Sequence, residues 1–175
     1  DTGAMYRTIG LYALQSGVDT RDEAAVAALL PGLSLALRYV DGEQRMFLNG
    51  EDVSGQIRTE RVSMAASHVS AHPSVRAYLL ETQRAFAREN NVVMDGRDIG
   101  TVVLPGASVK IFLTAGAEER AKRRYDELCA RGEAADYDTV LADVRRRDDN
   151  DRNRAAAPLR AAGDAGTAGT RTCPP

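Results

Sequence analysis

Apolar side chains recur at helical spacing in the first part of the chain. Residues 1–17 begin with turn-forming residues, continue with an amphipathic pattern and end at Gly17, which is typical of a helix C-terminus. A second helix is expected next, because Thr20 and Glu23 have the spacing of a capping box and Pro31-Gly32 ends the pattern. The chain is therefore predicted to open with two consecutive helices.

The pattern changes to strand spacing after Gly32. Residues 33–54 alternate apolar and polar side chains, and Asp41-Gly42 and Asn49-Gly50 stand where hairpin turns are expected. This segment predicts a small antiparallel sheet inserted between helical regions.

Helical and strand-like segments alternate beyond the insert. Helices are expected at 59–71, from Pro73 to about Asn90, at 117–131 and at 137–154. Short apolar runs at 91–95 and 108–115 have the length of buried strands. Strands separated by helices indicate an α/β fold with a parallel sheet flanked by helices.

The stretch from Val92 to Pro105 reads VVMDGRDIGTVVLP and places charges at the end of a predicted strand. A plain turn needs one Gly or Asp, whereas here Asp95 and Asp98 bracket Arg97. Ligands of open α/β sheets bind beyond the carboxyl ends of the strands. We therefore interpret residues 95–98 as part of a ligand site.

Length and composition narrow the class of protein. The chain has 175 residues and a formal net charge of −2, so one domain with a core is expected and general nucleic-acid binding is not. It contains no run of about 18 apolar residues, so a membrane span is not expected. Cys129 and Cys173 have no metal-binding or redox spacing, which favours the reducing cytoplasm. We expect a cytoplasmic monomer.

Two helical segments are rich in arginine. The run RRRDDNDRNR at 145–154 places Arg147, Asp151 and Arg154 on one helix face. The run EERAKRR at 118–124 contributes Arg120, Arg123 and Arg124. Each run alone is explained by a solvated charged helix, but arginine forks also suit bidentate binding of phosphate. Together they predict a clamp over a polyphosphate and phosphoryl-transfer chemistry, which depends on positioning and charge neutralisation.

The two histidines carry a weaker signal. His68 and His72 are four residues apart, a spacing that can bind zinc, but no acidic residue lies between them and Pro73 follows at once. They are interpreted as surface histidines. No Ser-His-Asp or Cys-His arrangement has a comparable context, and the tyrosines form no stacking array for single-stranded nucleic acid.

Six segments together resemble the bacterial cytidylate kinase family, whose members phosphorylate CMP and dCMP. They are DTGAMYR, NGEDVSGQIRT, DGRDIGTVVLP, VKIFLTA, EERAKRR and RRDDNDRNRAAAPL, and they span residues 1 to about 159. Two of them, DGRDIGTVV and RDDNDRNRAAAPL, are specific to this family among nucleoside monophosphate kinases. The resemblance implies a P-loop kinase-type sheet, a monophosphate-binding subdomain that contains the antiparallel insert, and a helical lid.

The resemblance also implies which residues read the base. Ser67, Arg76 and Asp98 match the cytosine readers of the family. This assignment makes chemical sense for Asp98, because a carboxylate accepts a hydrogen bond from the cytosine 4-amino group. In DGRD, Arg97 would hold phosphate while Asp98 reads the base.

The remaining implied roles concern phosphate and sugar. The positions near the monophosphate are matched by Thr2, Arg7, Arg97 and Arg154. The contacts to the sugar and the transferring phosphate are matched by Arg147 and Asp151, and the lid over ATP by Arg120, Arg123 and Arg124. Gly96 completes the substrate-binding set, and the catalytic residues would be Arg97, Arg147, Asp151 and Arg154.

Two features depart from the family pattern. The family has an apolar strand and a glycine-rich P-loop ending in Gly-Lys-Ser/Thr, and no such pattern occurs in these 175 residues. After the segment APLRAAGDA at 157–165 the family continues through a strand and a final helix, whereas here the sequence continues as GTAGTRTCPP. We therefore expect a truncated, inactive form of a (d)CMP kinase that would use ATP and Mg²⁺ when complete. The alternative is a non-catalytic module that retains only the CMP pocket.

The expected layout follows from these patterns. Residues 1–32 and 59–162 would form the core, with a lid at about 117–154. Residues 33–58 would form the antiparallel insert, and residues 163–175 a disordered tail. No nucleic-acid or membrane partner is expected.

Overall fold

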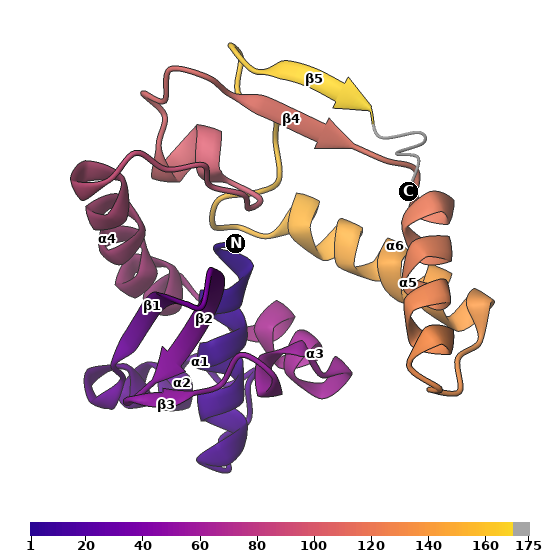
Figure 1. Ribbon diagram of the computed structural model, residues 1–175, viewed down its shortest axis with the longest axis horizontal. Coiled ribbons are helices and arrows are strands. Elements are labelled where there is room, and N and C mark those ends of the chain that lie inside the picture. The colour runs from indigo at the N-terminus through magenta and orange to yellow at the C-terminus, as the bar shows by residue number, and fades with distance from the viewer. Residues whose placement is uncertain (170–175) are drawn as a thin grey trace. The chain divides into compact units, whose positions relative to one another are not determined.

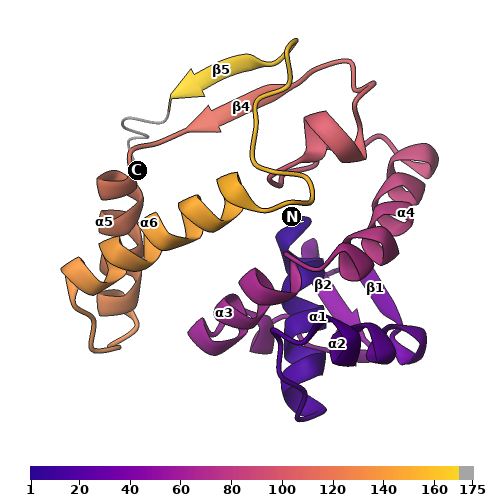
Figure 2. The same cartoon turned by 180° about the vertical axis from the view of Figure 1, so that it is seen from behind.

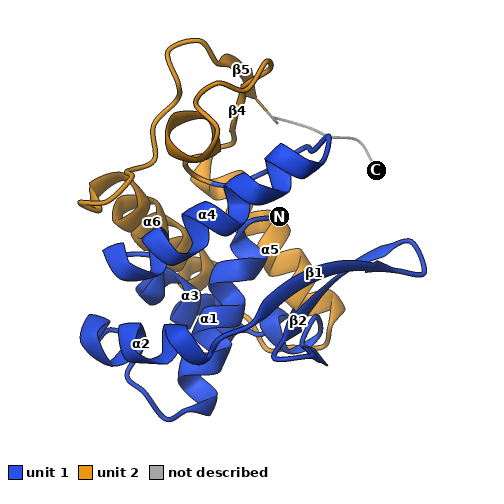
Figure 3. Cartoon of the chain, turned by 90° about the vertical axis from the view of Figure 1, so that its left-hand side faces the viewer, with its two compact units in different colours: residues 1–96 blue, residues 97–175 orange. Residues whose placement is uncertain are grey.

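A computed structural model describes residues 1–169 of the chain. The chain divides into two compact units, one of residues 1–96 and one that begins at Arg97 (Figure 3). Each unit combines helices with a small sheet, which confirms the α/β class. Within residues 1–169, no helix combines the length and the apolar character needed to cross a membrane.

The first unit consists of helices with an antiparallel sheet beside them (Figure 1). Its helices are α1 (Gly3–Gln15), α2 (Glu23–Leu29), α3 (Glu60–Val69) and α4 (Pro73–Glu89). Single 3-10 turns occur at Leu30–Gly32 and Gln56–Arg58. The strands are β1 (Leu35–Val40), β2 (Glu43–Leu48) and β3 (Glu51–Asp52).

The antiparallel insert is confirmed, and its turn residues determine its register. Asp41 and Gly42 both have positive φ, as do Asn49 and Gly50. These conformations suit two-residue hairpin turns and the residue types found there. Val40 consequently pairs with Glu43 between β1 and β2, and Leu48 pairs with Glu51 between β2 and β3.

The core of the first unit forms where α1 packs against α3. Ile9 of α1 and Val69 of α3 are at most 2% exposed. Gly10 permits this close packing, because a β-carbon there would lie 2.9 Å from the backbone nitrogen of Ala66. The contact holds together two helices that both carry predicted site residues.

The helix boundaries agree with the sequence pattern except at the start of α2. His72 and Pro73 begin α4 as expected, with Pro73 in its first turn. The predicted capping box of Thr20 and Glu23 does not form. Asp22 is the N-cap of α2, and its side chain accepts a hydrogen bond from the backbone nitrogen of Ala25 at 3.1 Å. Thr20 lies before the cap, and its hydroxyl bonds to another partner.

The second unit joins a two-stranded parallel sheet to a pair of helices (Figure 2). A π-helical turn (Ile99–Val103) is followed by β4 (Ile111–Thr114), α5 (Ala117–Ala130), α6 (Tyr137–Asn153) and β5 (Gly166–Gly169). Strands β4 and β5 pair in parallel, with Ile111 opposite Gly166. Helices α5 and α6, which span most of the predicted lid, pack on each other.

Three expectations about residues 91–175 are corrected. Residues 91–95 form no strand, and Val93 is fully exposed, because no strand among the described residues pairs with this segment. The expected buried strand at 108–115 forms as β4, but Ile111 and Leu113 are 64% and 65% exposed. The expected disorder from residue 163 does not hold for β5, and residues 170–175 lie outside the described part of the chain.

Candidate functional site

In the second unit three of the predicted catalytic residues lie together, because Arg97 and Arg154 both contact the carboxylate of Asp151. The Nε of Arg97 donates to Oδ2 of Asp151 at 2.9 Å, and Nη1 of Arg154 lies 3.4 Å from Oδ1. Arg97 comes from the loop before the π-helical turn, whereas Asp151 and Arg154 come from the last turn of α6 and its C-cap. Because Arg97 is 61% exposed, much of its guanidinium group is accessible to a ligand.

Arg154 is held in place by the backbone that follows α6. Its side chain is only 7% exposed, and its Nε donates to the carbonyl of Ala157 at 2.8 Å. Ala157 has a φ of 48°, a left-handed conformation that costs free energy for a residue with a β-carbon. The chain also returns to the helix at Leu159, whose nitrogen donates to the carbonyl of Asp151 at 2.8 Å. The segment after α6 thus orients the guanidinium group of Arg154.

A second ion pair links the two arginine-rich helices. Arg120 of α5 donates from both Nη atoms to the two carboxylate oxygens of Asp148 on α6, at 2.8 and 2.6 Å. These hydrogen bonds hold the pKa of Asp148 below its usual value and raise the pKa of Arg120. The sequence analysis did not single out Asp148, although its position in the run RRRDDND provided a signal.

The ion pair between Arg120 and Asp148 bears on the predicted role of the lid arginines in binding ATP. Both Nη atoms of Arg120 donate to Asp148, and its Nε donates to the carbonyl of Ala115. A phosphate would therefore have to displace the carboxylate of Asp148 to bind the guanidinium group of Arg120. Arg124 pairs with Glu127 at 3.4 Å. Arg123 is exposed on α5. In this structure Arg120 therefore joins α5 to α6.

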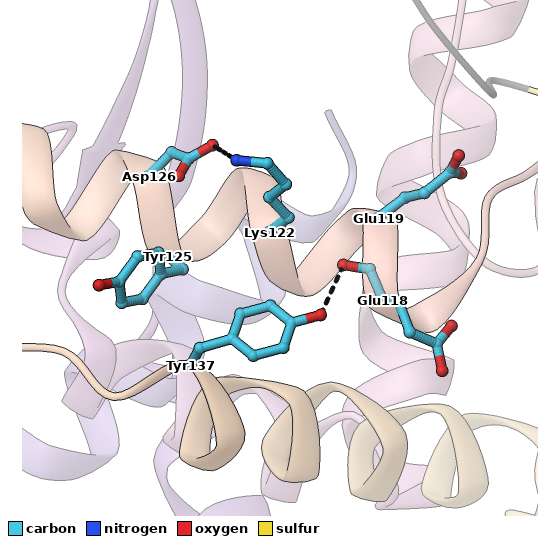
Figure 4. A pocket seen from close by; sticks show the side chains of 6 residues that line it. All are labelled: Glu118, Glu119, Lys122, Tyr125, Asp126 and Tyr137. Carbon is cyan, nitrogen blue, oxygen red and sulfur yellow. Dashed lines mark hydrogen bonds and ion pairs between the residues drawn. The ribbon is translucent and has the colours of Figure 1, made fainter.

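Figure 4 shows a shallow pocket on α5 and the start of α6, and the predicted lid arginines do not line it. Its walls are Glu118, Glu119, Lys122, Tyr125, Asp126 and Tyr137. Lys122 is bound to Asp126 at 2.9 Å, and the hydroxyl of Tyr137 donates to the carbonyl of Glu118. Three carboxylates and one paired lysine do not suit a polyphosphate, so this pocket is not assigned to ATP.

Asp98 is placed at the entrance of the π-helical turn. It is 7% exposed, and its backbone carbonyl accepts hydrogen bonds from the nitrogens of Val102 and Val103 at 2.9 and 3.2 Å. The main chain of Asp98 therefore stabilises this turn. The carboxylate belongs to a buried residue that directly follows the exposed Arg97.

The first unit carries two predicted phosphate contacts at the start of α1. Thr2 is 6% exposed and is the N-cap of the helix. Its hydroxyl donates to the carbonyl of Asp95 at 2.8 Å, and its backbone nitrogen donates to the same oxygen at 3.1 Å. A hydrogen bond from this hydroxyl to phosphate would therefore replace its bond to Asp95. Arg7 lies one turn further along α1, and its Nη1 is 3.7 Å from Oδ2 of Asp1.

The predicted cytosine readers Ser67 and Arg76 lie on either side of the connection between α3 and α4. Ser67 is half-buried in the last turns of α3. Arg76 is in the first turns of α4, where its Nη1 donates to the carbonyl of Ser70 at 3.2 Å. Its guanidinium carbon lies 5.7 Å from the ring centre of Tyr6, within reach of a cation–π interaction. Tyr6 is a further residue that the sequence analysis missed.

The predicted residues therefore form two groups, one in each unit. The first unit carries Thr2, Arg7, Ser67 and Arg76, with the exposed Gly96 as its last residue. The second carries Arg97, Asp98, Arg147, Asp151 and Arg154, in addition to the three lid arginines. The guanidinium groups of the second unit can hold a phosphate by charge-assisted hydrogen bonds.

Known proteins resemble this chain over nearly all of its length. The family model described as cytidylate kinase matches residues 1–173. A cytidylate kinase of Pasteurella multocida is 53% identical over 165 residues, which cover 94% of this chain and 73% of that protein. Cytidylate kinases of Caldicellulosiruptor bescii and Mycobacterium leprae are 49% and 52% identical, again over 94% of this chain and 73% of each protein.

Proposed function

The chain belongs to the cytidylate kinase family, and from that premise we propose that its residues serve the transfer of the γ-phosphoryl group of ATP to CMP or dCMP. In this reaction an oxygen of the monophosphate forms a bond to the γ-phosphorus. The bond from that phosphorus to the β–γ bridging oxygen breaks, and ADP and CDP are the products. The chemistry needs alignment and charge neutralisation more than a covalent nucleophile.

The observation that carries the proposal is the cluster of Arg97, Asp151 and Arg154 in the second unit. Asp151 orients both guanidinium groups, and Arg147 lies one turn before Asp151 on the same face of α6. Several fixed guanidinium groups can neutralise a monophosphate as it attacks a second phosphate. We assign Arg97 and Arg154 to the monophosphate, and Arg147 and Asp151 to the sugar and the transferring phosphate.

Base recognition is assigned to Ser67, Arg76 and Asp98. Cytosine presents a 4-amino donor next to acceptor atoms, so its recognition needs both an acceptor and a donor from the protein. Asp98 supplies a carboxylate acceptor from a buried position, and Arg76 supplies donors. Uracil presents an acceptor in place of the amino group, and it would face the carboxylate unfavourably.

The proposal includes ATP as phosphate donor with Mg²⁺, a cytoplasmic location and a monomeric state. In residues 1–169, no group of three or more His, Cys, Asp or Glu side chains is arranged to hold a metal ion. Mg²⁺ is commonly held by one or two carboxylates together with substrate phosphates and waters, so it would bind together with the nucleotides. The 175 residues also contain no Gly-Lys-Ser/Thr phosphate loop. The second candidate function for these 175 residues is the binding of CMP without phosphoryl transfer.

Nucleotide binding tests the proposed specificity directly. Calorimetric titration of the 175-residue chain is expected to show CMP and dCMP binding about tenfold or more tightly than UMP or AMP. The reason is the single carboxylate assigned to the 4-amino group, which only cytosine carries in this position. Equal affinities for CMP and AMP would contradict the assignment.

Arg147→Lys is expected to weaken CMP binding about fivefold or more, although the charge is kept, because lysine cannot reproduce the planar fork. The matched control is Arg146→Lys. Arg146 is its neighbour on α6, is 55% exposed and pairs with Asp143 at the surface, so its replacement should leave the affinity unchanged. Equal CMP affinities of the Arg147→Lys variant and the unsubstituted chain would show that Arg147 lies on a solvated helix face and does not contact CMP.

A further inference from the structure

The two histidines of the chain hold the same residue, Thr20. Nδ1 of His68 lies 2.8 Å from the hydroxyl oxygen of Thr20, and Nε2 of His72 lies 2.9 Å from its backbone carbonyl oxygen. Thr20 and His72 are 6% and 8% exposed, and His68 is half-buried. The interpretation of His72 as a surface residue is therefore wrong, and both histidines form a hydrogen-bonded cluster with Thr20.

The chemistry of the partners defines part of this cluster. A carbonyl oxygen only accepts, so Nε2 of His72 carries a hydrogen and donates it to Thr20. The hydroxyl of Thr20 completes the link to His68 on α3. A third contact strengthens the attachment, since Oε1 of Glu23 on α2 accepts from the backbone nitrogen of Ser74 on α4 at 3.2 Å. The connection between α1 and α2 is thus attached to both α3 and α4.

The cluster lies directly beside two proposed base readers. His68 follows Ser67 in the last turn of α3. His72 is the N-cap of α4, and its carbonyl accepts from the backbone nitrogen of Arg76 at 3.2 Å. The side chain of Arg76 in turn donates to the carbonyl of Ser70, in the same short connection. The position of residues 70–72 therefore determines where the backbone of Arg76 lies and in which direction its guanidinium group points.

We propose that Thr20, His68 and His72 are positioning residues, which set the placement of Ser67 and Arg76 for base recognition. This inference rests on the proposed function. The first helix of the unit ends at Gln15, so the cluster links the connection between α1 and α2 to the α3–α4 corner that carries Ser67 and Arg76. Hydrogen bonds weaken steeply when distance and angle change. A small displacement of this corner would therefore reduce recognition of cytosine before it reduces stability.

The test uses Thr20→Val, which removes the hydroxyl and keeps the shape, with Thr20→Ser as the matched control that retains the hydroxyl. Affinities for CMP and UMP are measured by calorimetry, and unfolding is followed by circular dichroism in urea. We expect Thr20→Val to bind CMP about fivefold more weakly, with UMP binding unchanged and Thr20→Ser close to the original chain. His68→Ala removes the same hydrogen bond from the half-buried side and is expected to behave as Thr20→Val does.

The outcomes separate this inference from the function on which it rests. A parallel loss of CMP and UMP affinity, or no loss of either in folded Thr20→Val and His68→Ala, would overturn the positioning role. A second pair supplies rescue: His72→Gln keeps an N–H donor for the Thr20 carbonyl and should retain selectivity for CMP, whereas His72→Leu should lose it. If the unsubstituted chain binds no CMP at all, the proposed function itself fails.

Discussion

The 175-residue chain is expected to form no CDP from CMP and ATP above the uncatalysed rate. Kinases with a P-loop hold the ATP phosphates with backbone N–H groups and a lysine, and the loop Ser or Thr contributes to Mg²⁺ binding. The sequence contains only two lysines, Lys110 and Lys122, and neither stands in a Gly-Lys-Ser/Thr motif. Lys110 is bound to Asp164 and Lys122 to Asp126. Neither of these two lysines is therefore available for the role of a P-loop lysine.

The arginines do not replace the loop either. Arg120 is bound bidentately to Asp148, and Arg97 and Arg154 share Asp151. An arginine side chain contacts a phosphate through two parallel N–H groups, whereas a P-loop surrounds the phosphate with several converging backbone N–H donors. Loss of that arrangement removes both binding and alignment of the donor, and alignment alone contributes about 7–11 kcal/mol of the barrier reduction in well-oriented reactions.

The measurement is a coupled assay of ADP release together with calorimetric titration of ATP. The control is the same chain preceded by a strand and a Gly-x-x-x-x-Gly-Lys-Ser/Thr loop from a related cytidylate kinase, which should restore activity if the rest of the site is competent. Micromolar ATP affinity with measurable CDP formation by the 175-residue chain would show that the phosphate loop is dispensable here.

Local chemistry made much of the fold predictable. The positive φ values of Asp41, Gly42, Asn49 and Gly50 are those that Asp-Gly and Asn-Gly turns favour, and they determine the hairpin register. The break between α3 and α4 follows from Pro73, which cannot donate a hydrogen bond inside a helix. These features depend on a few neighbouring residues, and a sequence displays them directly.

Features that depend on distant partners were less predictable. An apolar run such as 91–95 becomes a strand only when another strand pairs with it, and the run itself carries no information on that neighbour. The bond of Thr20 to His68 spans 48 positions and competes with the local capping box. In the sequence Asp148 is one of several acidic residues in a charged helix, and only the packing of α5 on α6 pairs it with Arg120. In each case a long-range contact overrides the local pattern.

The candidate site shows the same division. The helical spacing of Arg147, Asp151 and Arg154 was readable from the sequence, and the structure places all three on α6 or its C-cap. The association of Arg97 with Asp151 joins residues 54 positions apart. Helical periodicity does not predict this contact, and neither did the resemblance. Asp151 orients the planar groups of Arg97 and Arg154 in advance of any ligand.

Asp98→Ala is expected to lower the affinity for CMP about tenfold to a hundredfold while the affinity for UMP stays nearly constant. Removing the carboxylate deprives the cytosine 4-amino group of its acceptor in a buried position, which leaves a donor without a partner. The substitution should not unfold the turn at 99–103. The backbone nitrogens of Thr101, Val102 and Val103 donate to the backbone carbonyl of residue 98, which alanine retains. Asp95→Ala is the matched control, because Asp95 belongs to the same DGRD stretch and its side chain is 76% exposed.

Asp98→Asn makes the test sharper than loss of affinity alone. The amide keeps the size of the carboxylate but adds an N–H₂ group, which can donate to the O4 atom of uracil. The ratio of CMP to UMP affinity, measured by calorimetry, should therefore fall further in Asp98→Asn than in Asp98→Ala, with UMP binding improved in absolute terms. A base contact through the side chain of residue 98 predicts this order. If CMP and UMP affinities decline together in both variants, the carboxylate supports the π-helical turn or the neighbouring Arg97 and does not read the base.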